Sequence, residues 1–215
     1  MILQIRLISF MFCMFLLHIT ALHSQTHTLR FKRITSQQGL LANRSTAVIQ
    51  DSEGALWAGN KIGINRFDGE ITKVYYVGQN NNINQFFEDS YKNIWVATDH
   101  GLYILDKKND SFVKIKTNTE KANKLLFSTV LCITSTKKNE LLISGVKDFL
   151  VKLKVDKNGQ IIDNSIKILN TPKVNRYVTK IIKGPNSKFW LGTDKGEVLC
   201  IENDVIKESG FVKSG

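Results

Sequence analysis

The chain has 215 residues and a formal net charge of +11. Its composition is 42% hydrophobic and 23% charged, which indicates a folded globular protein and excludes a disordered chain. The lysines and arginines are spread through turns and outer strands, with no basic helix or dense patch. We therefore expect a solvated basic surface with mild attraction for acidic ligands, and no nucleic acid partner.

The N-terminus is laid out as an export signal. Met1–Arg6 carries one positive charge, an apolar run follows from Leu7 to Leu22, and His23-Ser24-Gln25 forms a polar exit. This order predicts a signal peptide over residues 1–24 and an exported mature chain. An uncleaved anchor is the alternative, but the apolar run is shorter than the roughly 20 residues that span a bilayer.

A four-fold internal repeat dominates the rest of the sequence. DSEGALWAGN (51–60) recurs as DSYKNIWVAT (89–98), TKKNELLISG (136–145) and GPNSKFWLGT (184–193). One column of the repeat holds Trp57, Trp95, Leu142 and Trp190, and a second column holds Gly63, Gly101, Asp148 and Gly196. A period of about 40 to 50 residues is typical of β-propeller blades.

Each repeat unit reads as four short strands separated by turns. In the first unit, Asp68-Gly69 is a strong hairpin signal because both residues tolerate a positive φ. No segment after residue 25 shows a convincing helical period, and Asp156–Ser165 resembles a long outer loop. We predict an all-β chain of about four four-stranded antiparallel sheets, with blades at 46–77, 83–115, 129–169 and 178–207.

The repeated residues have structural explanations. One large ring per blade at a fixed strand position would fill the space between adjacent sheets, so we expect the three tryptophans to be buried there rather than to stack on sugars. The aligned glycines fit tight bends. Asp51 and Asp89 follow the inner strands and are expected to cap turns rather than to form an acid–base pair.

Signatures of catalysis and of cofactor binding are missing. The sequence has no glycine-rich nucleotide loop, no nucleophile elbow and no Cys/His spacing typical of zinc. We expect no catalytic residue, no metal and no cofactor in this chain. Cys132 and Cys200 are expected to be two buried free thiols.

The first repeat and its lead-in resemble a known family. TAVIQDSEGALWAGNKIGINRFDG (46–69), preceded by FKRITSQQGLLANRS (31–45), resembles the two-component regulator propeller repeat; the third unit departs from it at Leu142 and Asp148. The resemblance implies a periplasmic sensor region of a hybrid histidine kinase, attached to the inner membrane in the full-length parent. Such regions usually sense polysaccharide fragments and signal to transcription, through a kinase region absent from this sequence.

Four blades are fewer than this family generally uses. We therefore expect the N-terminal part of a longer sensor, whose remaining blades and kinase region are partners of this one. Open lateral sheet faces would favour self-association, a homodimer included. Two alternatives stay open: an exported propeller enzyme acting on carbohydrates, and a non-catalytic protein-binding propeller.

A ligand is expected at one face of the blades. The bends between second and third strands gather there with the loops that enter each inner strand, and their cationic, carboxylate and hydroxyl groups suit an oligosaccharide. The predicted ligand-binding residues are Arg44, Lys61, Asp99, His100, Lys147, Asp194 and Lys195.

Overall fold

The computed structural model describes Gln4, Arg6, Met11 and the ranges 33–69, 71–146, 149–170 and 177–211. The chain divides into a short N-terminal unit, Met1–Arg33, and a second unit, Ile34–Gly215. The predicted signal peptide lies outside the described residues except for Gln4, Arg6 and Met11. Within the described residues, no helix combines the length and hydrophobicity that a membrane span requires.

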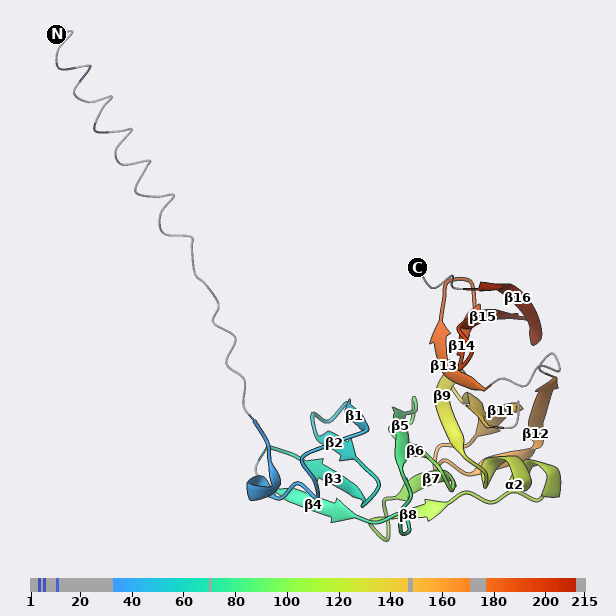
Figure 1. Ribbon diagram of the computed structural model, residues 1–215, viewed down its shortest axis with the longest axis horizontal. Helices are drawn as coiled ribbons and strands as arrows, with labels where there is room; N and C mark the ends of the chain where they lie inside the picture. Colours follow the sequence, from blue (N-terminus) through green and yellow to red (C-terminus); the bar gives the residue numbers. More distant parts are fainter. Residues whose placement is uncertain are drawn as a thin grey trace. The chain divides into compact units, whose positions relative to one another are not determined.

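The second unit consists of four antiparallel sheets of four strands each, in simple chain order (Figure 1). The first sheet contains β1 (Ala47–Gln50), β2 (Leu56–Gly59), β3 (Ile64–Phe67) and β4 (Thr72–Tyr75). The second contains β5 (Ile83–Glu88), β6 (Ile94–Thr98), β7 (Gly101–Asp106) and β8 (Ser111–Lys114). The third contains β9 (Val130–Lys137), β10 (Glu140–Gly145), β11 (Phe149–Val155) and β12 (Ile161–Asn170). The fourth contains β13 (Val178–Lys183), β14 (Phe189–Thr193), β15 (Glu197–Glu202) and β16 (Val205–Phe211). The predicted fold class, an all-β array of propeller blades, is confirmed.

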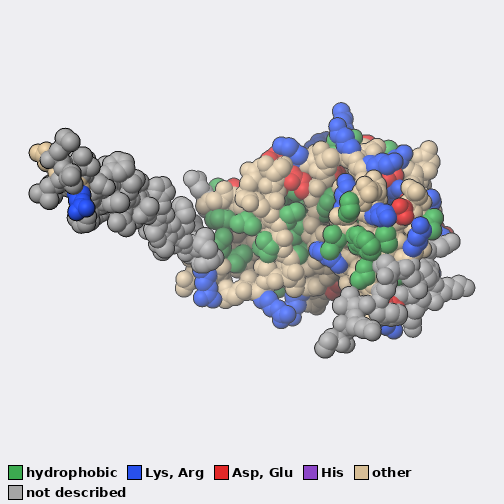
Figure 2. Space-filling model, turned by 90° about the horizontal axis from the view of Figure 1, so that it is seen from above, with side chains coloured by type: hydrophobic (Ala, Val, Ile, Leu, Met, Phe, Trp, Pro, Cys, Tyr) green, Lys and Arg blue, Asp and Glu red, His purple; other side chains and the backbone are tan. Residues whose placement is uncertain are grey.

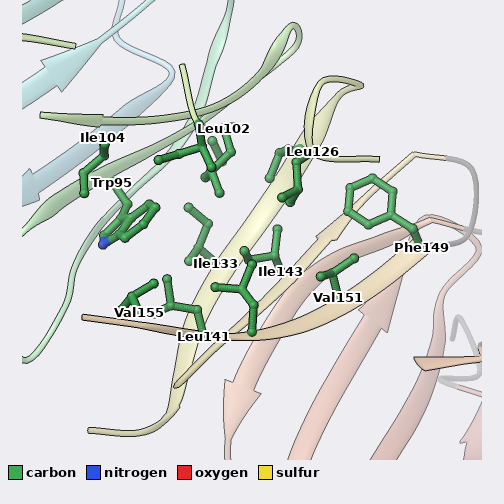
Figure 3. Close-up of a cluster of buried hydrophobic side chains, with 14 residues drawn as sticks. Trp95, Leu102, Ile104, Leu126, Ile133, Leu141, Ile143, Phe149, Val151 and Val155 are labelled. Atoms are coloured by element: carbon green, nitrogen blue, oxygen red, sulfur yellow. The ribbon is translucent and has the colours of Figure 1, made fainter. Parts of the chain in front are cut away.

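The first strand of each sheet contacts the first strand of the next, because β1 meets β5, β5 meets β9 and β9 meets β13. Successive sheets therefore pack face to face, and we call each packed interface a seam. Three buried hydrophobic clusters fill the three seams. Figure 3 shows the cluster of the middle seam, where Trp95 of the second sheet meets Ile133, Leu141 and Ile143 of the third.

Two of the three repeated tryptophans occupy the seams as predicted. Trp57 on β2 is 1% exposed, and its ring lies 6.5 Å from the ring of Phe86 in the second sheet. Trp95 on β6 is fully buried, and Leu142 takes the corresponding position on β10 in the third seam. Rings of this size bury enough apolar surface to dominate the energetics of a seam.

The expected burial of Trp190 is wrong. This side chain lies on the second strand of its sheet, β14, but it is 38% exposed. Its neighbours Phe189 and Leu191 point into the third seam, so the alternation of the strand directs Trp190 to the opposite face. In the other sheets that face meets the following sheet, and among the described residues none follows the fourth. Ile182, paired with Trp190 across the ladder, is 59% exposed on the same face.

The aligned glycines mark bends where a side chain would clash or where φ is positive. Gly101, at the start of β7, has φ +123°, and a Cβ there would lie 2.9 Å from the carbonyl oxygen of Leu126. A Cβ on Gly63 would lie 2.7 Å from the carbonyl oxygen of Tyr75. Gly196 has φ +76° in the bend before β15. Only glycine accommodates such close approaches or angles without strain.

Two local elements differ from the sequence prediction. A helix, α2 (Glu120–Leu126), lies between the second and third sheets and buries Ala122 and Leu126, four residues apart on one face. The expected outer loop at Asp156–Ser165 is shorter, because β12 already begins at Ile161. The carboxylate of Asp156 accepts hydrogen bonds from the backbone N–H groups of Asn158 and Gln160, which closes the turn early.

The lead-in segment is held against the first sheet. It begins with a 3-10 turn, η2 (Ser36–Gln38), whose N-cap Thr35 forms a capping box with Gln38. The buried amide of Asn65 on β3 then accepts a hydrogen bond from the Leu41 N–H and donates one to the Gly39 carbonyl, each at 2.9 Å. These contacts fix the chain that leads to Arg44.

Candidate ligand-binding rim

The rim is the face where the bends after β2, β6, β10 and β14 meet the segments that enter β1, β5, β9 and β13. The structure brings Arg44 and Lys61 together there. Both line a cavity of about 390 Å³, together with Ala42, Thr46, Asn60, Ile62 and Asn82. Two of the seven predicted ligand-binding residues therefore share one hollow, which we call the rim cavity.

The bend that carries Lys61 is rigidly built. Asn60 is 5% exposed, and its side-chain oxygen accepts hydrogen bonds from the N–H groups of Ile62 (2.7 Å) and Gly63 (3.2 Å). Its own backbone N–H donates to the Gly63 carbonyl at 3.0 Å. Buried backbone groups need such partners, so Asn60 closes the bend while the side chain of Lys61 stays exposed.

Thr46 ties the wall of the rim cavity to both sheets. Its hydroxyl lies 3.1 Å from the carbonyl oxygen of Gly59 in the first sheet and 2.7 Å from that of Ile83 in the second. A Cβ added to Gly59 would lie 2.7 Å from the side chain of Ile83, so the two sheets meet closely beside the cavity. The rim cavity therefore sits over the first seam.

A chain of amides connects the rim cavity to Asp99. Asn82 donates from its side chain to the side-chain oxygen of Asn84 at 3.0 Å, and Asn84 donates to Oδ1 of Asp99 at 3.0 Å. Asn84 also lies 2.9 Å from the carbonyl oxygen of Val130 at the start of the third sheet. The carboxylate of Asp99 is thus used to orient this network, and it does not line the cavity itself.

The remaining predicted residues lie outside the rim cavity. His100 is exposed, and its backbone N–H donates to the side chain of Asn81 at 2.9 Å. Asp194 and Lys195 lie in the bend of the fourth sheet, where Oδ1 of Asp194 accepts a hydrogen bond from the Tyr177 N–H at 2.7 Å. Lys147 lies outside the described residues. The structure therefore assembles one part of the predicted site and not a complete ring.

Sequence reasoning placed Asn60 in the rim bend but missed Thr46 and Asn82, which line the rim cavity, and Asn84, which bonds Asn82. A signal was present in the asparagine-rich segment Asn80–Asn82 and in Asn84, immediately before and within the second inner strand. Asparagine is common in turns, so the sequence alone predicts an ordinary loop here. In the structure, Asn82 lines the same cavity as Arg44 and Lys61.

The electrostatic character of the rim cavity is cationic. Its lining carries two cations and two primary amides and no carboxylate. In the described part of the chain, neither Arg44 nor Lys61 forms an ion pair. Such a hollow can attract an anionic group and hydrogen-bond polar substituents beside it. No group of three potential metal ligands occurs among the described residues.

Figure 2 shows the lysines and arginines of the second unit spread over the visible face rather than gathered in one patch. This distribution agrees with the expected solvated basic surface. The rim cavity is therefore characterised by two cations in a lining without a carboxylate, and not by a high local density of charge.

Comparison with known proteins shows that other propellers share this fold. Residues 78–100, which contain β5, β6 and the bend that follows, match the family model described as the two component regulator propeller. The extracellular domain of the hybrid two component system BT3049 from B. thetaiotaomicron superposes with a TM-score of 0.68 at 22% identity, over 86% of this chain and 26% of that one. The corresponding domain of BT4673 gives 0.63 at 19% identity, over 84% and 27%.

A lyase also shares the architecture. Virginiamycin B lyase from Staphylococcus aureus superposes with a TM-score of 0.60 at 14% identity, over 79% of this chain and 56% of that one. No curated protein matches the sequence. The chain spans about a quarter of the length of the two extracellular domains, and identities this low establish the fold alone. The chain is thus an array of propeller blades, one segment of which, residues 78–100, matches the two component regulator propeller model.

Proposed function

We propose that this chain is the ligand-sensing segment of an extracytoplasmic propeller in a hybrid two-component regulatory system. The family match at residues 78–100 and the similarity to extracellular domains of such systems support this assignment. In the complete parent, ligand binding on the periplasmic side would be passed to a kinase region and from there to transcription.

The ligand we propose is a glycan fragment that carries an acidic substituent. This choice rests on one observation: Arg44 and Lys61 line the same cavity, and that lining has no carboxylate. A uronate or sulfate group would accept charge-assisted hydrogen bonds from both side chains. The amides of Asn60 and Asn82 in the wall supply polar partners for neighbouring hydroxyl groups.

The position of the cavity suggests how binding would be transmitted. Its lining comes from the first sheet and from Asn82 at the entry to the second, and the amide chain continues to the entry of the third sheet. A ligand that orders Asn82 would therefore act on the relative positions of three sheets. Such coupling requires that the ligand bind one arrangement of the sheets more tightly than another.

Binding of defined oligosaccharides to the full chain tests the proposal. Isothermal titration would compare a uronate-containing oligosaccharide with a neutral one of the same length, for the native chain and for Arg44→Ala, Lys61→Ala and Lys116→Ala. Lys116 is an exposed lysine beyond β8 and serves as the matched control.

We expect the acidic oligosaccharide to bind more tightly than the neutral one, and each of the two cavity variants to weaken it by about tenfold, as for the loss of one charge-assisted hydrogen bond. Lys116→Ala should leave the affinity unchanged. Equal affinity of all four proteins would remove the rim cavity as the binding site. Shortened or unsaturated oligosaccharide after incubation would instead indicate an enzyme.

A further inference from the structure

A second cavity lies at the opposite end of the strands from the rim. It has a volume of about 500 Å³ and lies between the β7–β8 hairpin of the second sheet and the β11–β12 hairpin of the third. Three lysines line it, Lys107 and Lys108 from the first hairpin and Lys157 from the second. We call it the hairpin cavity.

Asp106 and Asp156, which begin the two turns, accept hydrogen bonds within those turns, whereas Asp110 of the first hairpin pairs with Lys73 of the first sheet. Oδ1 of Asp106 accepts the backbone N–H of Lys108 at 2.9 Å, and its Oδ2 accepts the side chain of Asn109 at 2.7 Å. Hydrogen bonds from Asn109 and Lys108 lower the pKa of Asp106, so it stays ionised in this role. Asp156 closes the other turn through Oδ1, as described above. Asp156 does not line the hairpin cavity, whereas Asp106 lines it beside Lys107 and Lys108 with both carboxylate oxygens bonded to its own turn.

None of the three lysines has a carboxylate partner within the described ranges of the chain. Cavities in the first and third seams differ in this respect. The first contains Lys73 paired with Asp110, and the third contains Lys152 paired with Glu140 and Asp204. The hairpin cavity thus combines the largest of these volumes, about 500 Å³ against 280 and 290 Å³, with three lysines that form no salt bridge among the described residues. Its one carboxylate, that of Asp106, is bonded to its own turn.

The cavity also has an apolar floor. Ile104 is buried at its base, and Val113, its partner across the β7–β8 ladder, is 40% exposed. The ring of Tyr91 forms part of the wall. Exposed apolar surface beside unpaired cations suits a ligand that has both an apolar body and an anionic group.

Close backbone packing fixes the two hairpins relative to each other. A Cβ added to Gly159 would lie 2.0 Å from Cδ1 of Ile104, so the backbone of the second hairpin rests directly on the second sheet. The side chain of Asn93 also donates to the carbonyl of Lys157 at 3.4 Å. The backbone positions of the lysines are therefore fixed before a ligand binds, which reduces the conformational entropy lost on binding.

We propose that the hairpin cavity binds a small anionic molecule with an apolar body, such as an aryl or acyl carboxylate or sulfate. Its apolar part would cover Val113, and its anionic group would lie between the ammonium groups of Lys108 and Lys157. This site is separate from the rim cavity and does not depend on the proposed sensing function.

The test uses 2-naphthalenesulfonate as the probe on the full chain, with affinity measured by isothermal titration. Inorganic sulfate and the neutral 2-naphthalenemethanol separate the charged and apolar contributions. The main variant is Lys108→Ala/Lys157→Ala, and its matched control is Lys116→Ala/Lys121→Ala, which removes two exposed lysines elsewhere. All four are exposed positions, so circular dichroism should show an unchanged fold.

We expect the sulfonate to bind more tightly than sulfate or the neutral alcohol, and the main variant to bind it at least about tenfold more weakly than the control. Val113→Ser should also weaken binding, whereas Ile182→Ser, on the exposed face of the fourth sheet, should not. The proposal is overturned if the native chain does not bind the sulfonate, if sulfate binds equally well, or if both double variants behave alike.

Discussion

The indole N–H of Trp95 donates a hydrogen bond to Oδ2 of Asp89 across 2.9 Å, and the equivalent bond joins Trp57 to Asp51 across 2.7 Å. In each case the other carboxylate oxygen accepts backbone N–H groups of the turn before the tryptophan. One aspartate thus closes a turn and satisfies the buried indole, as buried polar groups require. In the third repeat, Thr136 replaces the aspartate and Leu142 replaces the tryptophan.

Replacing Asp89 by alanine should destabilise the chain by about 3 kcal/mol, because several donors would be left without partners in a buried site. Asp89 is 5% exposed and also accepts a bond from the side chain of Asn93. Urea unfolding followed by tryptophan fluorescence measures the effect. Glu53→Ala, at an exposed turn position, is the control and should change stability by less than about 0.5 kcal/mol. Equal midpoints for the two variants would contradict this role of Asp89.

The position of each tryptophan predicts unequal costs of truncation. Trp57→Ala should cost about 3 to 5 kcal/mol because it empties a packed seam. Trp190→Ala removes a side chain that is already 38% exposed, so we expect a cost nearer to about 1 kcal/mol. Chemical unfolding of both variants under one set of conditions gives the comparison. A larger loss for Trp190 than for Trp57 would show that its exposed face is covered.

Acid should weaken the third seam first. Lys152 of the third sheet lies 3.0 Å from Glu140 and 2.8 Å from Asp204 of the fourth. Burial opposes ionisation of Glu140, but hydrogen bonds from Thr136 and Lys152 outweigh it, and its pKa falls below the ordinary 4.5. Hydrogen bonds from Lys152 and Lys167 likewise lower the pKa of Asp204 below 3.8.

Carboxyl groups with a lowered pKa contribute stability that is complete above their ordinary values and is lost as the pH falls through the folded-state values. Stability should therefore be constant from neutral pH down to about pH 5 and decline below about pH 4. The variant Asp204→Asn should be less stable at neutral pH and show a shallower decline. Unfolding midpoints from pH 3 to pH 7 test this, and a slope identical to that of the native chain would refute it.

The thiol of Cys132 should be unreactive in the folded chain. It is a free cysteine, 1% exposed, and burial raises its pKa, which lowers the fraction of reactive thiolate. Its sulfur also accepts the N–H of Ile181 across the third seam at 3.3 Å. Iodoacetamide labelling read by peptide mass spectrometry should modify Cys132 only in denaturant. Rapid native labelling would mean that the seam opens readily.

The repeat makes the sheets predictable, since four aligned turns and strands define the blades in the sequence itself. The prediction that Asp51 and Asp89 cap turns is confirmed, and so is that of two buried free cysteines. The error at Trp190 arose because the repeat gives the strand position of a side chain but not whether another sheet covers it. The short helix α2 was not predicted, because seven residues are too few to show a helical period in the sequence.

The sites were harder to predict because they join residues without any shared motif. Arg44 and Lys61 were found through the expected position of the bends, while Asn82 and Asn84 looked like ordinary turn residues. The ion pair of Lys152 with Asp204 joins positions 52 residues apart and leaves no pattern in either segment. Its existence depends on how two sheets dock, which only the packed structure specifies.

The simple chain order of the strands has a consequence for folding. Among the described residues, strands paired in a ladder are neighbours in sequence, and the main contacts between sheets join each sheet to the sheet before it and the sheet after it. Stability in such an array is approximately a sum over single units and nearest-neighbour interfaces. A substitution that weakens the third seam should therefore detach the fourth sheet and leave the first three assembled. In such a variant, hydrogen exchange of the backbone amides should be fastest from Val178 onwards.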